Sequence, residues 1–178
     1  MSSDFFPSMK KNIVVLSLLA VAVLTLPACQ NRDAKKMQRQ MKSLAKTYLE
    51  EEQITGYDSL TVVCVDTLTE LRYARLNSQL LQEMIQAYQQ QYEETALNGD
   101  QQKLEYLNLY INEALRTQQD FDDLIDAGDL PDEAPLLFMV SCYYYKDGQK
   151  IPFVFLSTSD KKKTYTLDPF GDNLLYKD

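Results

Sequence analysis

The chain contains no histidine and no tryptophan. Without histidine it lacks the usual general base near neutral pH, the usual triad partner of serine or cysteine, and the commonest zinc ligand. Basic residues are also scarce, with 18 Lys and Arg against 26 Asp and Glu and a net charge of −8. Nucleic-acid phosphates require a basic face, so nucleic acid is not an expected partner. We predict no cofactor and no metal, and we favour a protein that is not an enzyme.

Cysteine is rare as well, with three in the whole chain. Cys64 and Cys142 lie within apolar or aromatic runs, residues 62–65 and 138–145, and they form no CxxC pair. Two interpretations stay open at this point. They are buried thiols that pack as small hydrophobic residues, or they form one disulfide between neighbouring strands in an oxidising compartment.

The N-terminal segment has the layout of a secretory signal. Lys10 and Lys11 precede residues 13–28, which are almost entirely apolar. The apolar run Ile13–Leu26 is shorter than the roughly 20 residues of a comfortable membrane-spanning helix. Positive charge followed by a short apolar run and a small residue is typical of a signal peptide that is cleaved on export.

The end of this segment, Leu26-Pro27-Ala28-Cys29, resembles the lipobox of Gram-negative bacterial lipoproteins. The resemblance implies cleavage after Ala28 and lipidation of Cys29 with a diacylglyceryl group and a fatty acid such as palmitate. Two or three buried acyl chains anchor a protein stably, whereas one is marginal. No aspartate follows Cys29 directly, which by the same resemblance implies an outer-membrane anchor with the body facing the periplasm. An ordinary cleaved signal, an uncleaved anchor, exposure at the cell surface and a start at Met9 instead of Met1 remain alternatives.

Three segments follow from these observations: a signal peptide (1–28), a lipidated tether (29–34) and a single α+β domain (35–178). The 150 residues left after cleavage are enough to bury a hydrophobic core without disulfides. Their net charge of −9 argues against the body lying flat on an anionic membrane surface.

Hydrophobic periodicity and turn residues predict seven elements after the tether. Asn98-Gly99 is a strong helix stop, and Asp147-Gly148 is a hairpin signal. The continuous apolar run within residues 58–68 predicts a strand buried on both faces. The predicted helices are 33–52, 69–97 and 100–127, and the predicted strands are 58–68, 134–145, 150–157 and 163–168.

This order, α-β-α-α-β-β-β, predicts an α+β fold in which the helices, including a long αα-hairpin, pack on one face of a curved antiparallel sheet. The element order over the mature chain resembles the cystatin-like and NTF2-like group, in which a curved sheet wraps a helix. The competing architecture is a small helical domain with an appended strand meander.

Two surfaces are candidates for binding. One is an aromatic platform on the last strands, with the alternative that its side chains only fill the core. The other is an acidic patch near the end of the second long helix, where a cation site, a dock for a basic partner and a simple solvated helix end are the alternatives. The platform residues are Tyr143, Tyr145, Val154 and Leu156, and the acidic residues are Asp120, Asp122, Asp123, Asp126 and Asp129.

The first helix has a basic face formed by Lys35, Arg39, Lys42 and Lys46. This face is either simply solvated or assisted by anionic lipid head groups next to the tether. The function expected from these features is that of a membrane-anchored, non-catalytic binding or assembly module for an unknown protein or small ligand. The alternative is a hydrolase or lyase that uses carboxylates and tyrosines in an NTF2-like cavity.

Overall fold

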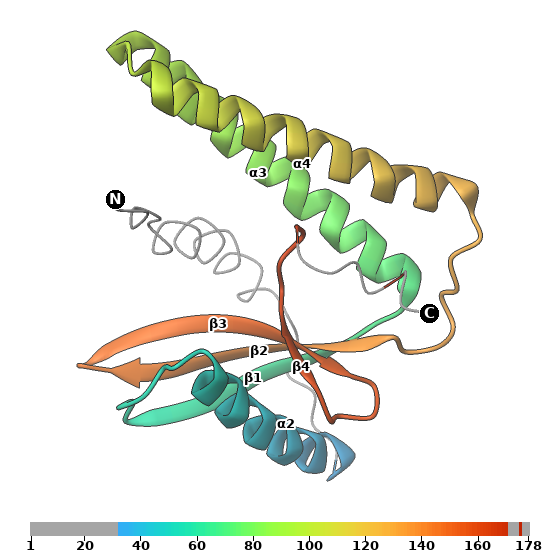
Figure 1. Ribbon diagram of the computed structural model, residues 1–178. Helices are drawn as coiled ribbons and strands as arrows, with labels where there is room; N and C mark the ends of the chain where they lie inside the picture. The colour runs from blue at the N-terminus through green and yellow to red at the C-terminus, as the bar shows by residue number, and fades with distance from the viewer. Residues whose placement is uncertain (1–31, 171–174, 176–178) are drawn as a thin grey trace, which may run out of the picture. The chain divides into compact units, whose positions relative to one another are not determined.

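The computed structural model describes residues 32–170 and residue 175 (Figure 1). The predicted cleavage site at Ala28 and lipidation site at Cys29 lie outside the described residues. The predicted α+β class and the order α-β-α-α-β-β-β are confirmed. The elements are α2 (Arg32–Glu51), β1 (Ser59–Leu68), α3 (Glu70–Asn98), α4 (Gln101–Ala127), β2 (Leu137–Lys146), β3 (Gln149–Thr158) and β4 (Thr164–Thr166).

The chain predicted as one domain contains two compact units. One unit, here the sheet unit, comprises the described residues up to Thr67 together with Leu137–Thr166. The other, the hairpin unit, comprises Leu68–Leu136 and the described residues from Leu167 onward. The long αα-hairpin is therefore a unit with its own core, and α2 is the helix that packs on the sheet within the sheet unit (Figure 1).

The sheet is an antiparallel meander with the strand order β1-β2-β3-β4. β2 and β3 form a long hairpin in which Val140 lies opposite Phe155 and Tyr145 opposite Lys150. The turn between them is the predicted Asp147-Gly148, with φ values of 51° and 74°. Two positive φ values characterise the type I′ turn, whose twist matches that of the flanking strands.

Two backbone hydrogen bonds flank the β1–β2 pair. Asp58 N donates to Tyr145 O at one end, and Leu136 N donates to Leu68 O at the other. Val62 and Val65 of β1, three positions apart, both pack against the core cluster of this unit.

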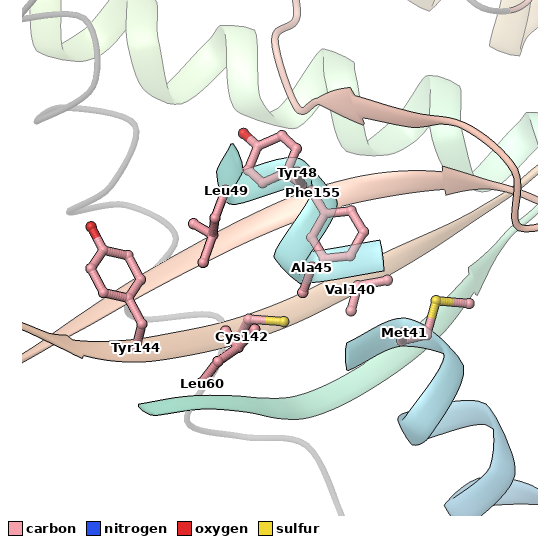
Figure 2. Close-up of a cluster of buried hydrophobic side chains, with 9 residues drawn as sticks. All are labelled: Met41, Ala45, Tyr48, Leu49, Leu60, Val140, Cys142, Tyr144 and Phe155. Carbon is pink, nitrogen blue, oxygen red and sulfur yellow. The ribbon is translucent and has the colours of Figure 1, made fainter. Parts of the chain in front are cut away.

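The core of the sheet unit lies between α2 and one face of the sheet (Figure 2). Met41, Ala45 and Leu49, spaced by four residues, share one face of α2 and are fully buried. The Tyr48 ring stacks on Phe155 with centroids 5.2 Å apart. The other buried members of the cluster are Leu60, Val140, Cys142 and Tyr144.

The helices of the hairpin unit end where the sequence predicts. Gly99 caps α3 at φ 71°, and the Asp100 side chain accepts from Lys103 N to begin α4. Thr69 begins α3 by accepting from Arg72 N. Leu81 and Phe121 are buried here, at 0% and 2% exposed.

No helix within residues 32–170 is long and apolar enough to cross a membrane.

Three details of the strands differ from the prediction. β4 covers only Thr164–Thr166 of the predicted residues 163–168. β2 begins at Leu137 rather than at residue 134, because Pro131 and Pro135 keep the preceding segment irregular. β1 is an edge strand and Val63 on it is 40% exposed, so the prediction of burial on both faces is wrong. Its β-branched residues fit a half-buried edge as well as a central strand.

Candidate functional site

The predicted aromatic platform lies on one face of the β2–β3 hairpin. Tyr143 is opposite Pro152 and Tyr145 is opposite Lys150, and alternation places both tyrosines on the face that points away from α2. Val154 and Leu156 are on the same face but are only 8% and 2% exposed. The four side chains thus share a face as predicted, and the two tyrosines at the turn end are the accessible members.

The accessible end of the platform is ordered by contacts among its own side chains. The Tyr143 and Tyr145 rings meet edge to face, with centroids 5.7 Å apart. The Lys150 ammonium lies 4.1 Å from the centroid of the Tyr143 ring, a cation–π contact. Tyr145 remains 37% exposed, so part of its ring faces solvent beside the Tyr143–Lys150 pair. Such a surface can stack on an apolar or planar group and attract an acidic one.

The acidic residues of α4 do not converge on a common point. Asp122 accepts from Ser78 Oγ at 2.6 Å, which joins α4 to α3. Asp123 accepts from Gln119 Nε2 at 2.6 Å within the same helix. Asp120, Asp126 and Asp129 are exposed. Within the described ranges no group of three or more Asp, Glu, Cys or His residues is arranged to hold a metal ion.

The two cysteines are thiols rather than a disulfide-bonded pair, so the disulfide interpretation is wrong. Cys142 is buried as the other interpretation predicts, whereas Cys64 is only half-buried. Cys142 lies inside the core of the sheet unit, and burial raises the pKa of its thiol from 9.0 to about 12. Cys64 on β1 donates to Asp66 Oδ2 at 3.7 Å. A buried thiol with a raised pKa is a poor nucleophile, so Cys142 has a packing role.

A tyrosine–hydroxyl–carboxylate chain links the C-terminal end of α2 to β4. The Tyr48 hydroxyl lies 3.4 Å from Thr166 Oγ1, and Thr166 in turn donates to Glu52 Oε1 at 3.2 Å. Burial raises the pKa of Tyr48, whereas the hydrogen bond with Thr166 opposes that rise. The phenol therefore stays protonated at neutral pH, and the chain fastens β4 to the helix.

The sequence did not reveal a groove between α2 and β1. It has a volume of about 380 Å³ and is lined by Gln38, Arg39, Lys42, Thr61 and Val62. It offers a guanidinium, an ammonium, an amide and a hydroxyl above one apolar side chain. The basic face of α2 was visible in the sequence, but its juxtaposition with Thr61 depends on how the helix crosses the sheet.

No known family model matches the sequence. Comparison with curated proteins and with solved structures likewise gives no significant match. Functional inference for this chain therefore depends on its own residues.

Proposed function

We propose that the chain is a membrane-anchored lipoprotein of the outer membrane, with its folded part facing the periplasm as a non-catalytic binding module for a protein or small ligand. The anchor is proposed from the sequence, since Lys10, Lys11 and the apolar run that follows end in Ala28-Cys29. Lipid on Cys29 holds the protein at the membrane, and cleavage after Ala28 removes the signal.

The observation that carries the binding role is the exposed aromatic end of the β2–β3 hairpin. Tyr143, Tyr145 and Lys150 combine two aromatic rings with a cation on a rigid hairpin. Aromatic side chains present a large contact area at low conformational entropy, which is why they are frequent in binding sites. Their face of the sheet points away from α2, so a ligand bound there does not compete with the core.

The chemistry of the described polar groups favours binding over catalysis. Tyr48 and Glu52 belong to one hydrogen-bond chain, but the Thr166 hydroxyl lies between the phenol and the carboxylate. The groove beside α2 is lined by neither a carboxylate nor a tyrosine. A hydrolase or lyase of the alternative kind needs a carboxylate that converges on a tyrosine hydroxyl inside a cavity.

Position-specific photo-crosslinking in intact cells tests the binding role. A photoreactive residue at position 145 should give a discrete adduct, because Tyr145 lies in the proposed contact surface. Tyr143→Ala in the same protein should abolish the adduct. The matched control is position 97, since Leu97 is 89% exposed in the hairpin unit.

Identical adducts at positions 145 and 97, or no adduct at 145, would contradict the proposed surface. For a small ligand, native mass spectrometry of protein purified from cells should show a bound mass that Tyr145→Ala loses. Measurable turnover that disappears on changing one carboxylate or tyrosine would instead support the enzyme alternative.

A further inference from the structure

The positive charge of this acidic chain is concentrated next to the proposed anchor. Residues 34–49 contain five Lys and Arg and no Asp or Glu. The rest of the mature chain from Cys29 onward carries 11 Lys and Arg against 25 Asp and Glu. The chain is therefore acidic as a whole but contains one basic segment.

The helix α2 presents this charge to solvent. Its apolar positions Met41, Ala45 and Leu49 pack on the sheet at 0% exposure, so the opposite side of the helix faces outward. Four cations on that outward side and on the flank of the helix beside β1 are exposed, and within the described part of the chain none of them has an ion-pair partner. These cations are Lys36, Arg39, Lys42 and Lys46, and they are the basic face from here on, with Lys36 in place of the predicted Lys35.

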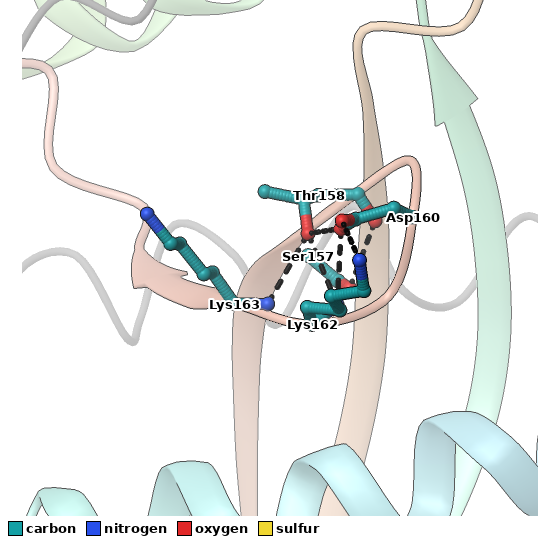
Figure 3. A network of polar contacts seen from close by, with 5 residues as sticks. All are labelled: Ser157, Thr158, Asp160, Lys162 and Lys163. Carbon is teal, nitrogen blue, oxygen red and sulfur yellow. Dashed lines mark hydrogen bonds and ion pairs between the residues drawn. The ribbon is translucent and has the colours of Figure 1, made fainter.

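The β3–β4 turn adds further charge beside the same helix (Figure 3). Lys161 Nζ donates to Gln40 Oε1 of α2 at 3.3 Å, which places the turn against the helix. Thr158 Oγ1 accepts from the backbone N–H groups of Lys162 and Lys163, both at 3.2 Å. Asp160 pairs with Lys162, so Lys161 and Lys163 are the net positive charges that this rigid turn contributes.

The groove between α2 and β1 is suited to a phosphate group. Arg39 and Lys42 supply charge, since a guanidinium can bind phosphate through two hydrogen bonds and an ammonium binds it as a point charge. Gln38 and Thr61 supply neutral donors, and Val62 provides an apolar contact. A phosphodiester with a short polar head group fits this combination.

The position of the basic face in the chain identifies the source of the phosphate. Three peptide units separate Cys29 from Arg32, the first residue of α2, and they span roughly 10 Å when fully extended. Membrane charge acts on basic residues within a Debye length, about 8 Å at physiological salt. A lipid anchor on Cys29 therefore keeps Arg32 within roughly 10 Å of the anchored residue, which allows α2 to lie along the membrane with its basic face against the lipid head groups.

We propose that the basic face of α2, together with Lys161 and Lys163, docks on anionic phospholipid head groups, with one head-group phosphate in the groove beside Arg39 and Lys42. This inference rests on the proposed anchor at Cys29. The acidic remainder of the chain is repelled by the same membrane, so the docked protein has one preferred orientation. Tyr143 and Tyr145 are on the sheet face opposite α2 and stay free for a ligand.

The test uses a fluorescent reporter in the lipidated full-length protein. The chain has no tryptophan, so Ser43→Trp on the exposed side of α2 gives a single reporter. The protein is reconstituted into phosphatidylcholine vesicles with or without phosphatidylglycerol, each containing the same fraction of a head-group spin-labelled quencher. Stronger quenching is expected with phosphatidylglycerol, and raising the salt to about 1 M should remove the difference.

Charge removal provides the matched comparison. Each basic residue near an anionic surface changes the docking equilibrium by about fivefold, so Arg39→Gln with Lys42→Gln should weaken docking by about 25-fold. Lys103→Gln with Arg116→Gln, two exposed charges of α4, should leave the quenching unchanged. Both double variants lose the same net charge, so the comparison isolates position.

Equal quenching in neutral and anionic vesicles overturns the inference, and so does quenching that survives loss of Arg39 and Lys42. Equal quenching is also the result expected if an acidic protein, rather than lipid, covers this face. The mass of the same preparation reports on the anchor independently. If Cys29 carries no lipid, the proposed anchor fails. Docking is then tested by co-sedimentation with phosphatidylglycerol vesicles: salt-sensitive binding supports docking, and no binding contradicts it.

Discussion

Alkaline pH should destabilise the sheet unit through Cys142. This thiol is 1% exposed, and burial raises its pKa from 9.0 to about 12. In the unfolded chain the thiol loses its proton above pH 9, whereas in the folded chain it keeps the proton up to about pH 12. Deprotonation therefore favours the unfolded state, and the free energy of unfolding falls as the pH rises between these values.

The size of the effect follows from the two pKa values. The slope between the two pKa values is about 1.4 kcal/mol per pH unit, so moving from about pH 8 to about pH 10 lowers the free energy of unfolding by roughly 1 kcal/mol through this thiol. Tyr48 and Tyr144, whose pKa values burial also raises, add a loss of the same sign. Cys142→Val keeps a small apolar side chain in the strand and removes only the thiol contribution.

The assay is urea unfolding followed by far-UV circular dichroism at both pH values, for the wild type and Cys142→Val. The wild type should lose roughly 1 kcal/mol more than the variant between the two conditions, because the tyrosine contributions are common to both proteins. Equal losses in the two proteins would refute the deeply buried, protonated thiol. They would also place Cys142 outside the core that Figure 2 shows.

Two further variants test the packing of each unit. Phe155 is fully buried against Tyr48, so Phe155→Ala should lower the free energy of unfolding by about 3–5 kcal/mol. Leu97→Ala, at an exposed site, should change it by less than about 0.5 kcal/mol. Similar losses at both sites would contradict this core. Asn77 is 1% exposed and donates to Tyr73 O, but its Oδ1 is a buried atom without a partner among the described residues. Asn77→Leu should therefore raise the stability of the hairpin unit by about 1 kcal/mol or more in thermal unfolding, and a lower melting temperature would show that the amide is satisfied in solution.

Local signals in the sequence were sufficient for most of the fold. Asn98-Gly99 and Asp147-Gly148 have strong conformational preferences, so they predict a helix end and a hairpin without knowledge of the tertiary structure. The spacing of Met41, Ala45 and Leu49 likewise predicts which side of α2 is buried. These features depend only on residues close together in the chain.

Features that depend on distant residues were not predictable in this way. The pairing of residues 58–68 with residues 136–145 at the edge of the sheet joins segments far apart in the chain, and no local pattern reveals it. The groove at Arg39 requires Thr61 to lie beside α2, and the burial of Val154 and Leu156 requires the complete fold. The alternation rule placed the platform residues on one face but could not distinguish its open end from its buried part.

The most direct test of the proposed anchor is the intact mass of the protein extracted from the membrane fraction. We expect a chain that begins at Cys29 and carries the added mass of a diacylglyceryl group and an amide-linked fatty acid. A Cys29→Ala variant should lack that mass and should retain the signal segment, whereas Cys64→Ala should be lipidated normally. A wild-type chain that still begins at Met1 or Met9, or a cleaved chain without fatty acid in the soluble fraction, would contradict the proposed anchor.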